Sequence, residues 1–210
     1  MSTATLLRRG LAELKLDLTA LQQQKLLDYL ALLSRWNRAY NLTAVRDEQE
    51  MVTRHLLDSL AVLPHLNARR LIDVGSGAGL PGIPLAIALP QCEFSLLDSN
   101  GKKTRFLFQA VNTLGLGNCS VHRDRAENFR PLERFDAVLS RAFASLAAMI
   151  EACSHLLSED GVYLAMKGRL ADSELESVDP GVELQSVLDL HVPGLDEERC
   201  LVQLRPLGNN

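Results

Sequence analysis

From residue 71 onward, short runs of apolar residues alternate with segments of helical periodicity. The runs that predict strands are Leu71–Val74, Phe94–Asp98, Cys119–His122, Phe135–Ser140 and Gly161–Met166, with two later candidates at Val182–Leu190 and Cys200–Leu204. Helical patterns separate most of them, at Pro81–Leu89, Lys102–Leu114 and Leu146–Leu157. Buried strands that alternate with helices are typical of a parallel sheet covered on both faces. The right-handed crossover rule makes such a sheet doubly wound. We therefore expect an α/β fold with a doubly wound, mostly parallel, Rossmann-like sheet.

The segment before these runs contains no strand-like pattern. Leucines recur at helical spacing over Ala20–Arg35 and again over Asp47–Leu63, and the polar and aromatic stretch Trp36–Thr43 reads as their connector. We predict two parts: an N-terminal helical segment over residues 1–66 that packs on the core, and a Rossmann-like core over residues 67–210.

The first predicted strand runs into a glycine-rich turn, Asp73-Val74-Gly75-Ser76-Gly77-Ala78-Gly79-Leu80-Pro81-Gly82. Glycines at this place let a ligand approach the backbone closely, and doubly wound sheets bind ligands at the carboxyl ends of their strands. The spacing Gly77-x-Gly79-x-x-Gly82 fits a dinucleotide site, whereas Asp73, Gly75, Gly77 and Gly79 fit S-adenosylmethionine.

The carboxylate of Asp73 favours the methyl donor, because S-adenosylmethionine carries a cationic sulfonium and an ammonium but no pyrophosphate. Few residues remain for the substrate domain of a dehydrogenase. Asp98, at the end of the second strand, is expected to accept both ribose hydroxyls. The backbone N–H near Ala126, with Glu127 beside it, is expected at the adenine edge, although Glu127 read alone fits a solvated carboxylate nearly as well.

Basic residues recur where predicted strands end. They are Arg123 and Arg125 after the third strand, Arg141 after the fourth, Lys167 after the fifth, Lys102 at the start of the following helix, and Arg199 if the last strand is antiparallel. We expect these six cations around the cofactor and facing a phosphate backbone. The alternative for any one of them is an ion pair with Asp98, Asp124 or Glu127.

Motifs that are missing from the sequence disfavour two classes of methyl-acceptor atom. The fourth strand is followed by Ser140-Arg141-Ala142-Phe143 and not by the acid or amide with Pro-Pro-aromatic that amino-directed methyltransferases carry. Methylation at carbon 5 of a pyrimidine needs a nucleophilic cysteine in the site. We place none of the four cysteines at the rim, by which we mean the strand ends around the cofactor, so this chemistry is disfavoured. A ring nitrogen such as guanine N7 needs neither device, since its lone pair is free.

Bulk properties set further limits. The net charge of −4 lowers the expectation of nucleic-acid binding without excluding a local basic patch. Neither a signal peptide nor a membrane span is visible, and the cysteines are too dispersed for a metal site or a disulfide framework. We expect a cytoplasmic monomer with no metal, no membrane partner and no DNA partner.

Some residues with functional potential receive structural readings. His55 and Asp58 lie at helical spacing and are expected to make structural hydrogen bonds. Trp36 and Tyr40 are expected to pack between helices, and Phe143 to be a core ring, although stacking on a flipped base is an alternative.

Several segments together resemble the bacterial small-subunit ribosomal RNA methyltransferase G family, also called glucose-inhibited division protein B. They are Arg35-Trp36-Asn37, Tyr40–Thr43, Arg54–Ser59, Ile72–Pro84, Leu97-Asp98-Ser99, Ser140-Arg141-Ala142 and Lys167-Gly168. They span nearly the whole chain, and the run Ile72–Pro84 is long enough to be specific.

The resemblance implies N7 methylation of one guanine in 16S-type ribosomal RNA or a 30S-type subunit, with S-adenosylmethionine as donor and S-adenosylhomocysteine as product. It makes Gly75, Leu80, Ala126, Glu127 and Arg141 cofactor contacts, and Arg125, Lys167 and Arg199 candidates for RNA binding or catalytic support. Arg141 thus faces the cofactor, the phosphate backbone or both. Three alternatives remain: a small-molecule methyltransferase, a nicotinamide-dependent oxidoreductase, and a non-catalytic RNA-binding assembly factor.

Overall fold

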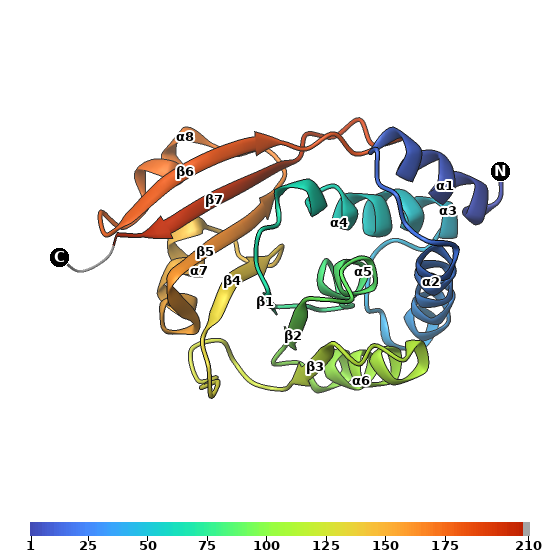
Figure 1. Cartoon of the computed structure of the whole chain (residues 1–210), viewed down its shortest axis with the longest axis horizontal. Helices are drawn as coiled ribbons and strands as arrows, with labels where there is room; N and C mark the ends of the chain where they lie inside the picture. The colour runs from blue at the N-terminus through green and yellow to red at the C-terminus, as the bar shows by residue number, and fades with distance from the viewer. Residues whose placement is uncertain (208–210) are drawn as a thin grey trace.

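A seven-stranded sheet organises the computed structural model, which describes residues 1–207 (Figure 1). The strands are β1 (Arg70–Val74), β2 (Glu93–Leu97), β3 (Cys119–His122), β4 (Phe135–Ser140), β5 (Leu157–Lys167), β6 (Val182–Asp189) and β7 (Cys200–Pro206). Their order is β3-β2-β1-β4-β5-β7-β6. The first five pair in parallel, and β7 is antiparallel to both β5 and β6. The predicted α/β class and mostly parallel sheet are confirmed.

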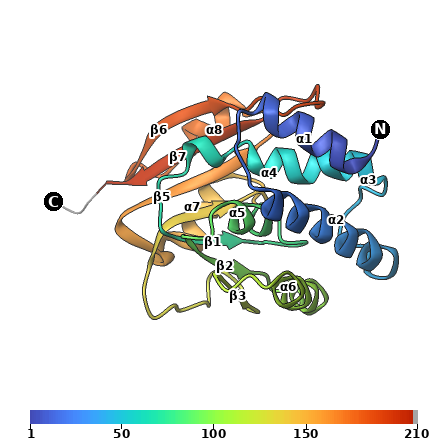
Figure 2. The same ribbon diagram turned by 45° about the vertical axis from the view of Figure 1, so that its right-hand side comes forward.

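Helices cover both faces of this sheet (Figures 1 and 2). The α-helices are α1 (Thr3–Glu13), α2 (Ala20–Tyr40), α3 (Glu48–Met51), α4 (Asp58–Leu60), α5 (Gly82–Ala88), α6 (Gly101–Leu114), α7 (Leu146–Cys153) and α8 (Asp172–Glu176). Shorter pieces are the π-helical turn η1 (Val52–Leu57) and the 3₁₀ turns η2 (Leu63–His65) and η3 (Ser154–Leu156). Along β1 the side chains alternate between two apolar cores: Leu71 packs with the α5 and α6 side, and Ile72 and Val74 pack with the α7 side.

The N-terminal helices share the first of these cores. Leu26 of α2 and Leu56 of η1 belong to the same buried cluster as Leu71 of β1 and Ile83 of α5. The N-terminal helices therefore share one apolar core with the sheet, and within it α2 packs against α5 and α6. The boundary at residue 66 stays a prediction, and residues 208–210 of the predicted core lie outside the described part.

The predicted connector Trp36–Thr43 is wrong in its first half, because α2 continues through Tyr40 and ends at Asn41, whose φ is 50°. Asn37 is buried in this helix, and its side chain donates to the carbonyl of Val45 and accepts from the N–H of Thr43. In the sequence, Asn37 resembles a turn residue. In the structure it lies within the last turn of α2, and its side chain binds the loop that follows the helix.

The connection from β3 to β4, residues 123–134, contains no helix. The chain crosses there in turns and bends. Its residues 124–127, which follow β3, line the cleft described below. None of the helices in residues 1–207 combines the length and the apolar character that a bilayer crossing requires.

Candidate active site

The glycine-rich turn lies between β1 and α5 and is held against the end of β2. Gly75, Gly77 and Gly79 have φ values of 71°, 60° and 88°, a region that disfavours any residue with a Cβ. The N–H groups of Gly75 and Ser76 both donate to the carbonyl of Leu97, over 2.9 and 3.1 Å. The loop is thus fixed by backbone contacts to the neighbouring strand.

Gly75 and Gly77 differ in the space around them. A Cβ at Gly75 would lie 2.6 Å from the Cβ of Ala142, so the chain that leaves β4 approaches the loop closely only because residue 75 is glycine. A Cβ at Gly77 would meet no atom nearer than 3.7 Å.

Asp73 lies beneath the loop and is 1 % exposed. Its Oδ2 accepts hydrogen bonds from Ser76 Oγ at 2.5 Å and from the N–H of Gly82 at 2.9 Å. Its Oδ1 is buried without a donor in the described residues. Burial raises the pKa of Asp73 to about 6, although the two hydrogen bonds lower it. Asp73 therefore holds the turn, with one acceptor atom still available.

Asp98 follows β2 directly and is 6 % exposed. Its Oδ2 accepts from the N–H of Gly77 at 2.9 Å, and its Oδ1 accepts from the N–H of Asn100 at 2.8 Å. Lys103 Nζ lies 3.9 Å from Oδ2. The carboxylate is thus oriented by two backbone donors and keeps lone pairs for further hydrogen bonds.

A cleft of about 460 Å³ opens beside this loop. Its lining brings together the predicted cofactor residues of three strand ends, namely Gly75, Asp98, Ala126 and Glu127, with Arg125. Asp73, Gly77, Gly79 and Leu80 are not in the lining; Gly79 packs against Ile83, and Leu80 is buried. Asp73, Gly79 and Leu80 face the interior side of the loop and not the cleft. Phe143 both lines the cleft and packs on the α7-side core, so it is only partly the core ring we expected.

A second, smaller cavity of about 160 Å³ lies at the ends of β4, β5 and β7. Arg141, Lys167 and Arg199 line it together with Asp58 and Cys200. Arg199 reaches this edge because β7 is antiparallel to β5, with Cys200 opposite Lys167. The same reversal makes our placement of the cysteines wrong, since Cys200 does lie at the rim. It is buried, its Sγ donates to the carbonyl of Gly168, and burial raises its pKa, which disfavours a nucleophilic thiolate.

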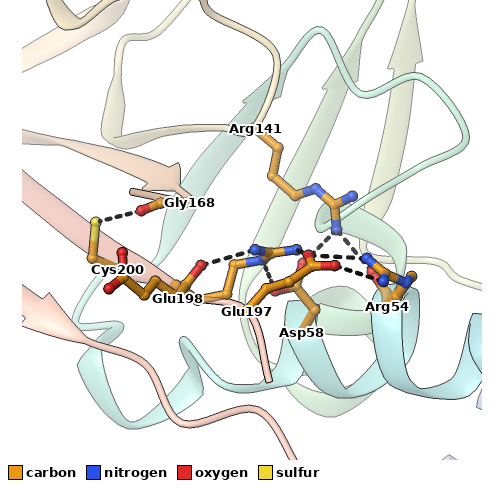
Figure 3. A network of polar contacts seen from close by, with 8 residues as sticks. Arg54, Asp58, Arg141, Gly168, Glu197, Glu198 and Cys200 are labelled. Atoms are coloured by element: carbon orange, nitrogen blue, oxygen red, sulfur yellow. Dashed lines mark hydrogen bonds and ion pairs between the residues drawn. The ribbon is translucent and has the colours of Figure 1, made fainter. Parts of the chain in front are cut away.

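The rim cations pair with carboxylates that we did not single out as partners. Asp58 Oδ2 lies 2.8 Å from Arg141 Nη1 (Figure 3). Asp58 Oδ1 lies 3.2 Å from Arg199 Nε. Glu197 extends the network, 2.9 Å from Arg199 and 2.6 Å from Arg54. Burial raises the pKa of Asp58, while the two arginines lower it. From the sequence we took Asp58 for a structural residue, and so missed this role.

Lys167 is also paired. Its Nζ lies 2.6 Å from Glu174 Oε1 and donates to the carbonyls of Phe143 and Ala144. Arg141, Lys167 and Arg199 are therefore neutralised in part. Arg123, Arg125 and Lys102 make no ion pair with the described side chains, which are those of residues 1–171 and 173–207. The basic rim is thus divided into a paired half and an unpaired half.

His55 lies in η1, three residues before Asp58, and does not contact it. Its Nε2 is 2.9 Å from Thr43 Oγ1, and burial lowers its pKa to about 4. A neutral, hydrogen-bonded imidazole agrees with the structural reading. Trp36 meets Phe106 of α6 edge-on, with ring centroids 5.7 Å apart, as predicted for packing between helices. Tyr40 lies 5.1 Å from Trp36 on the same helix and is exposed, so the prediction is wrong for Tyr40.

Comparisons with known proteins agree with this geometry. The family model described as rRNA small subunit methyltransferase G matches residues 22–202. Proteins named ribosomal RNA small subunit methyltransferase G from Marinobacter nauticus and Saccharophagus degradans are 54 % and 51 % identical to this chain. The first match covers 93 % of this chain and 92 % of the relative, and the second covers 92 % and 86 %. The solved glycopeptide N-methyltransferase MtfA, complexed with S-adenosylmethionine, shares the fold with a TM-score of 0.61 and 11 % identity, over 73 % of this chain and 95 % of that one.

Proposed function

The chain belongs to the rRNA small subunit methyltransferase G family, and from this premise we propose that it transfers a methyl group from S-adenosylmethionine to N7 of one guanine in small-subunit ribosomal RNA. Its similarity to relatives of that name extends over at least 92 % of its length in both of the matches described above. The reaction class follows from the family, and the N7 position is the finer part of the proposal.

The cleft residues fit the methyl donor. Asp98 would accept hydrogen bonds from the ribose hydroxyls, since its orientation is already fixed by the N–H groups of Gly77 and Asn100. The φ of 71° at Gly75 and the absence of a Cβ there let the chain after β4 approach the loop, so that Gly75 and Ala142 line the cleft together. The buried, unpartnered Oδ1 of Asp73 offers negative charge beneath a cationic ligand.

Ala126 and Glu127 would form the adenine end of the cleft, as the family resemblance implies. Both follow β3, on the connection that lacks a helix, and both line the cleft opposite the glycine loop. When bound, S-adenosylmethionine supplies an electrophilic methyl group on a sulfonium. The protein has to exclude water from that methyl group and hold the acceptor in line with it.

Guanine N7 has a free lone pair, so no proton has to be removed before it attacks. Orientation alone can contribute on the order of 7–11 kcal/mol to such a reaction. Arg141 and Lys167, whose positions are fixed by Asp58 and Glu174, would orient the acceptor nucleotide, and Arg199 would add positive charge beside them. Arg123, Arg125 and Lys102 would bind the phosphate backbone around it.

The observation that carries this proposal is the position of the Asp98 cleft beside the Arg141 and Lys167 cavity. Arg141 lines the smaller cavity, and the next residue, Ala142, lines the cofactor cleft. A methyl donor and an RNA base that occupied the two spaces would meet at the end of β4. We further propose that the protein acts as a monomer in the cytoplasm, which light scattering and fractionation test.

The test is to incubate the protein with radiolabelled S-adenosylmethionine and small subunits, or naked small-subunit RNA, from cells that lack the protein. Borohydride and aniline cleave RNA at 7-methylguanosine and map the modified position. We expect a single cleavage site that depends on the protein. Label at another atom contradicts the N7 assignment, and RNA binding without label indicates an assembly factor instead.

A further inference from the structure

Asp58 is a buried carboxylate that joins two distant parts of the chain to the N-terminal helices. Its side chain is 4 % exposed, and it contacts Arg141, 83 residues away, and Arg199, 141 residues away. Each of its oxygens takes one arginine: Oδ2 accepts from Arg141 Nη1 and Oδ1 from Arg199 Nε. A carboxylate taken out of water needs such partners, and charge-assisted hydrogen bonds fix their geometry.

The backbone around Asp58 is specialised. The π-helical turn Val52–Leu57 directly precedes it, within the run of helix from Glu48 to Leu60. A π turn shifts the phase of every later side chain relative to a regular α-helix, and such turns recur at functional sites. Here the residue that follows it is the one whose carboxylate meets the rim.

Arg141 keeps donors that Asp58 does not use. Its Nη1 donates to Asp58 and, at 3.5 Å, to the carbonyl of Arg54. Its Nε and Nη2 make no hydrogen bond in the described region. Figure 3 shows Arg141 reaching from the end of β4 onto Asp58, with Glu197 and Arg54 beside the carboxylate. One edge of the guanidinium is thus fixed while the rest remains available.

Arg199 contributes differently, because all of its nitrogens are engaged. Nε donates to Asp58, Nη1 to the carbonyl of Glu198, and Nη2 to Glu197. It therefore completes the charge balance around Asp58 and holds the chain before β7 in place. Asp58 itself has no oxygen left that is both exposed and unpartnered.

We propose that Asp58 is a positioning residue, which aligns Arg141 at the acceptor side of the cleft by binding Arg141 and Arg199 together. This inference rests on the proposed function and assigns the N-terminal helices a direct part in it. Asp58 lines the smaller cavity, but each of its oxygens already accepts from an arginine, so it acts on the acceptor through Arg141. The N-terminal segment is then more than a cover for the sheet.

The test compares D58N, R141M and the double variant in single-turnover methylation of small subunits from cells that lack the protein. We expect D58N to slow methyl transfer by about 10- to 100-fold, because Arg141 would no longer hold the acceptor guanine in line with the methyl group. The affinity for S-adenosylhomocysteine should stay within about threefold of wild type. In the double variant, D58N should add less than about threefold to the effect of R141M, because both remove one unit. A wild-type rate in D58N, or multiplied effects in the double variant, overturns the proposal.

D136N is the matched control. Asp136 of β4 accepts from the N–H groups of Arg69 and Arg70 at the start of β1, so it is a carboxylate that joins two segments at the end of the strands away from the cleft. Its substitution should leave methyl transfer unchanged. If D58N does not fold, D58E carries the test, since it keeps the charge and moves the carboxylate by one methylene; a rate between those of wild type and R141M is expected, and a wild-type rate contradicts the proposal.

A readout independent of catalysis is the side-chain Nε–H signal of Arg199 in ¹⁵N NMR spectra. We expect slow exchange with water in the wild type and D136N, and loss of that protection in D58N or D58E. Equal protection in all variants overturns the positioning role. This signal tests the positioning role of Asp58 even if the wild-type protein adds no methyl group. A lack of methyl transfer by the wild type would contradict only the proposed function.

Discussion

The Oδ2 atom of Asp98 accepts a hydrogen bond from the N–H of Gly77 at 2.9 Å, so the end of β2 and the glycine loop after β1 share one anchor. The contact joins the predicted ribose site to the loop that shapes the cleft. We therefore expect a substitution of Asp98 to lower the affinity for the cofactor more than it lowers the stability of the fold.

Replacing Asp98 by Ala removes this anchor and the acceptor for the ribose hydroxyls. Hydrogen bonds to a charged group contribute about 1.5–3 kcal/mol, so we expect roughly 10- to 100-fold weaker binding of S-adenosylhomocysteine. Calorimetric titration measures this. D98N, which keeps one acceptor oxygen, should fall between wild type and D98A; equal affinity in all three proteins places the ribose elsewhere.

The glycines of the loop differ from other glycines of the chain in what an alanine would cost. G75A combines a φ of 71° with a Cβ 2.6 Å from that of Ala142, so we expect about 3 kcal/mol of lost stability and little cofactor binding. Gly115, the C-cap of α6, has a φ of 59°, and a Cβ added there would have no atom within 4 Å, so G115A should cost only about 1 kcal/mol. Urea unfolding compares the two, and equal losses would mean that the contact with Ala142 is relaxed at no cost.

The pKa of Asp73 predicts a pH dependence of stability. Because the folded-state pKa is about 6 and the ordinary pKa of the group is 3.8, the folded protein holds this proton over a range where the unfolded chain has released it. The contribution of Asp73 to the free energy of unfolding therefore falls as pH rises from about 4 to about 6, by roughly 1–3 kcal/mol.

D73N tests this sign. An asparagine carbonyl oxygen in place of Oδ2 can still accept from Ser76 and Gly82, while the titrating charge is gone. We expect the stability of wild type relative to D73N to decline between pH 4 and 6 in urea unfolding experiments. His55, whose pKa is lowered to about 4, titrates in both proteins and cancels in the difference. A constant difference contradicts a raised pKa at Asp73.

The unpaired half of the rim predicts a salt effect. Arg123 packs on Gly101 at the start of α6 and makes no ion pair with any side chain that the structure describes. If it binds a phosphate, R123Q should lower the slope of log K for RNA against log salt by about 0.7–0.9 and leave S-adenosylhomocysteine binding unchanged. R205Q is the control, because Arg205 pairs with Asp160 at the opposite edge of the sheet. The same slope in R123Q and wild type removes Arg123 from the RNA surface.

Much of the fold could be predicted, because buried strands of a parallel sheet appear in the sequence as continuous apolar runs. Each of the seven observed strands lies on a predicted run, with ends that differ by a few residues. The direction of the last strand could not be read from its composition, and it decided the location of both Arg199 and Cys200. An antiparallel last strand brings Cys200 to the rim for the same reason that it brings Arg199 there, although we predicted this only for Arg199.

The cofactor side of the site was predicted better than the acceptor side. Asp98, Ala126 and Glu127 follow strands directly, so the order of the sheet alone brings them together at one cleft. The contacts of Asp58 depend on side chains that meet across 83 and 141 residues of sequence and on a π turn that no residue type marks. A buried acid in a helix near two strand-end arginines was the available signal.

Helical phase separates the two lysines at the start of α6. Lys103 lies 3.9 Å from Asp98 and lines the cofactor cleft, whereas Lys102, the cation that we predicted for the rim, is exposed and does not line that cleft. Asn100 caps the helix by accepting from the N–H groups of both lysines. The cap fixes which of two adjacent lysines faces the cleft, and a shift of one residue rotates the side chain by about 100°.

The central claim is that a methyl donor in the Asp98 cleft is presented to a guanine held beside Arg141. The most direct measurement is nucleoside mass spectrometry of small-subunit RNA, from cells lacking the protein, after incubation with S-adenosylmethionine and either wild type or D98A. The account predicts a single 7-methylguanosine gained with wild type and a strongly reduced yield with D98A at limiting donor. No gain with wild type, a methyl group on another atom, or equal yields from the two proteins would contradict it.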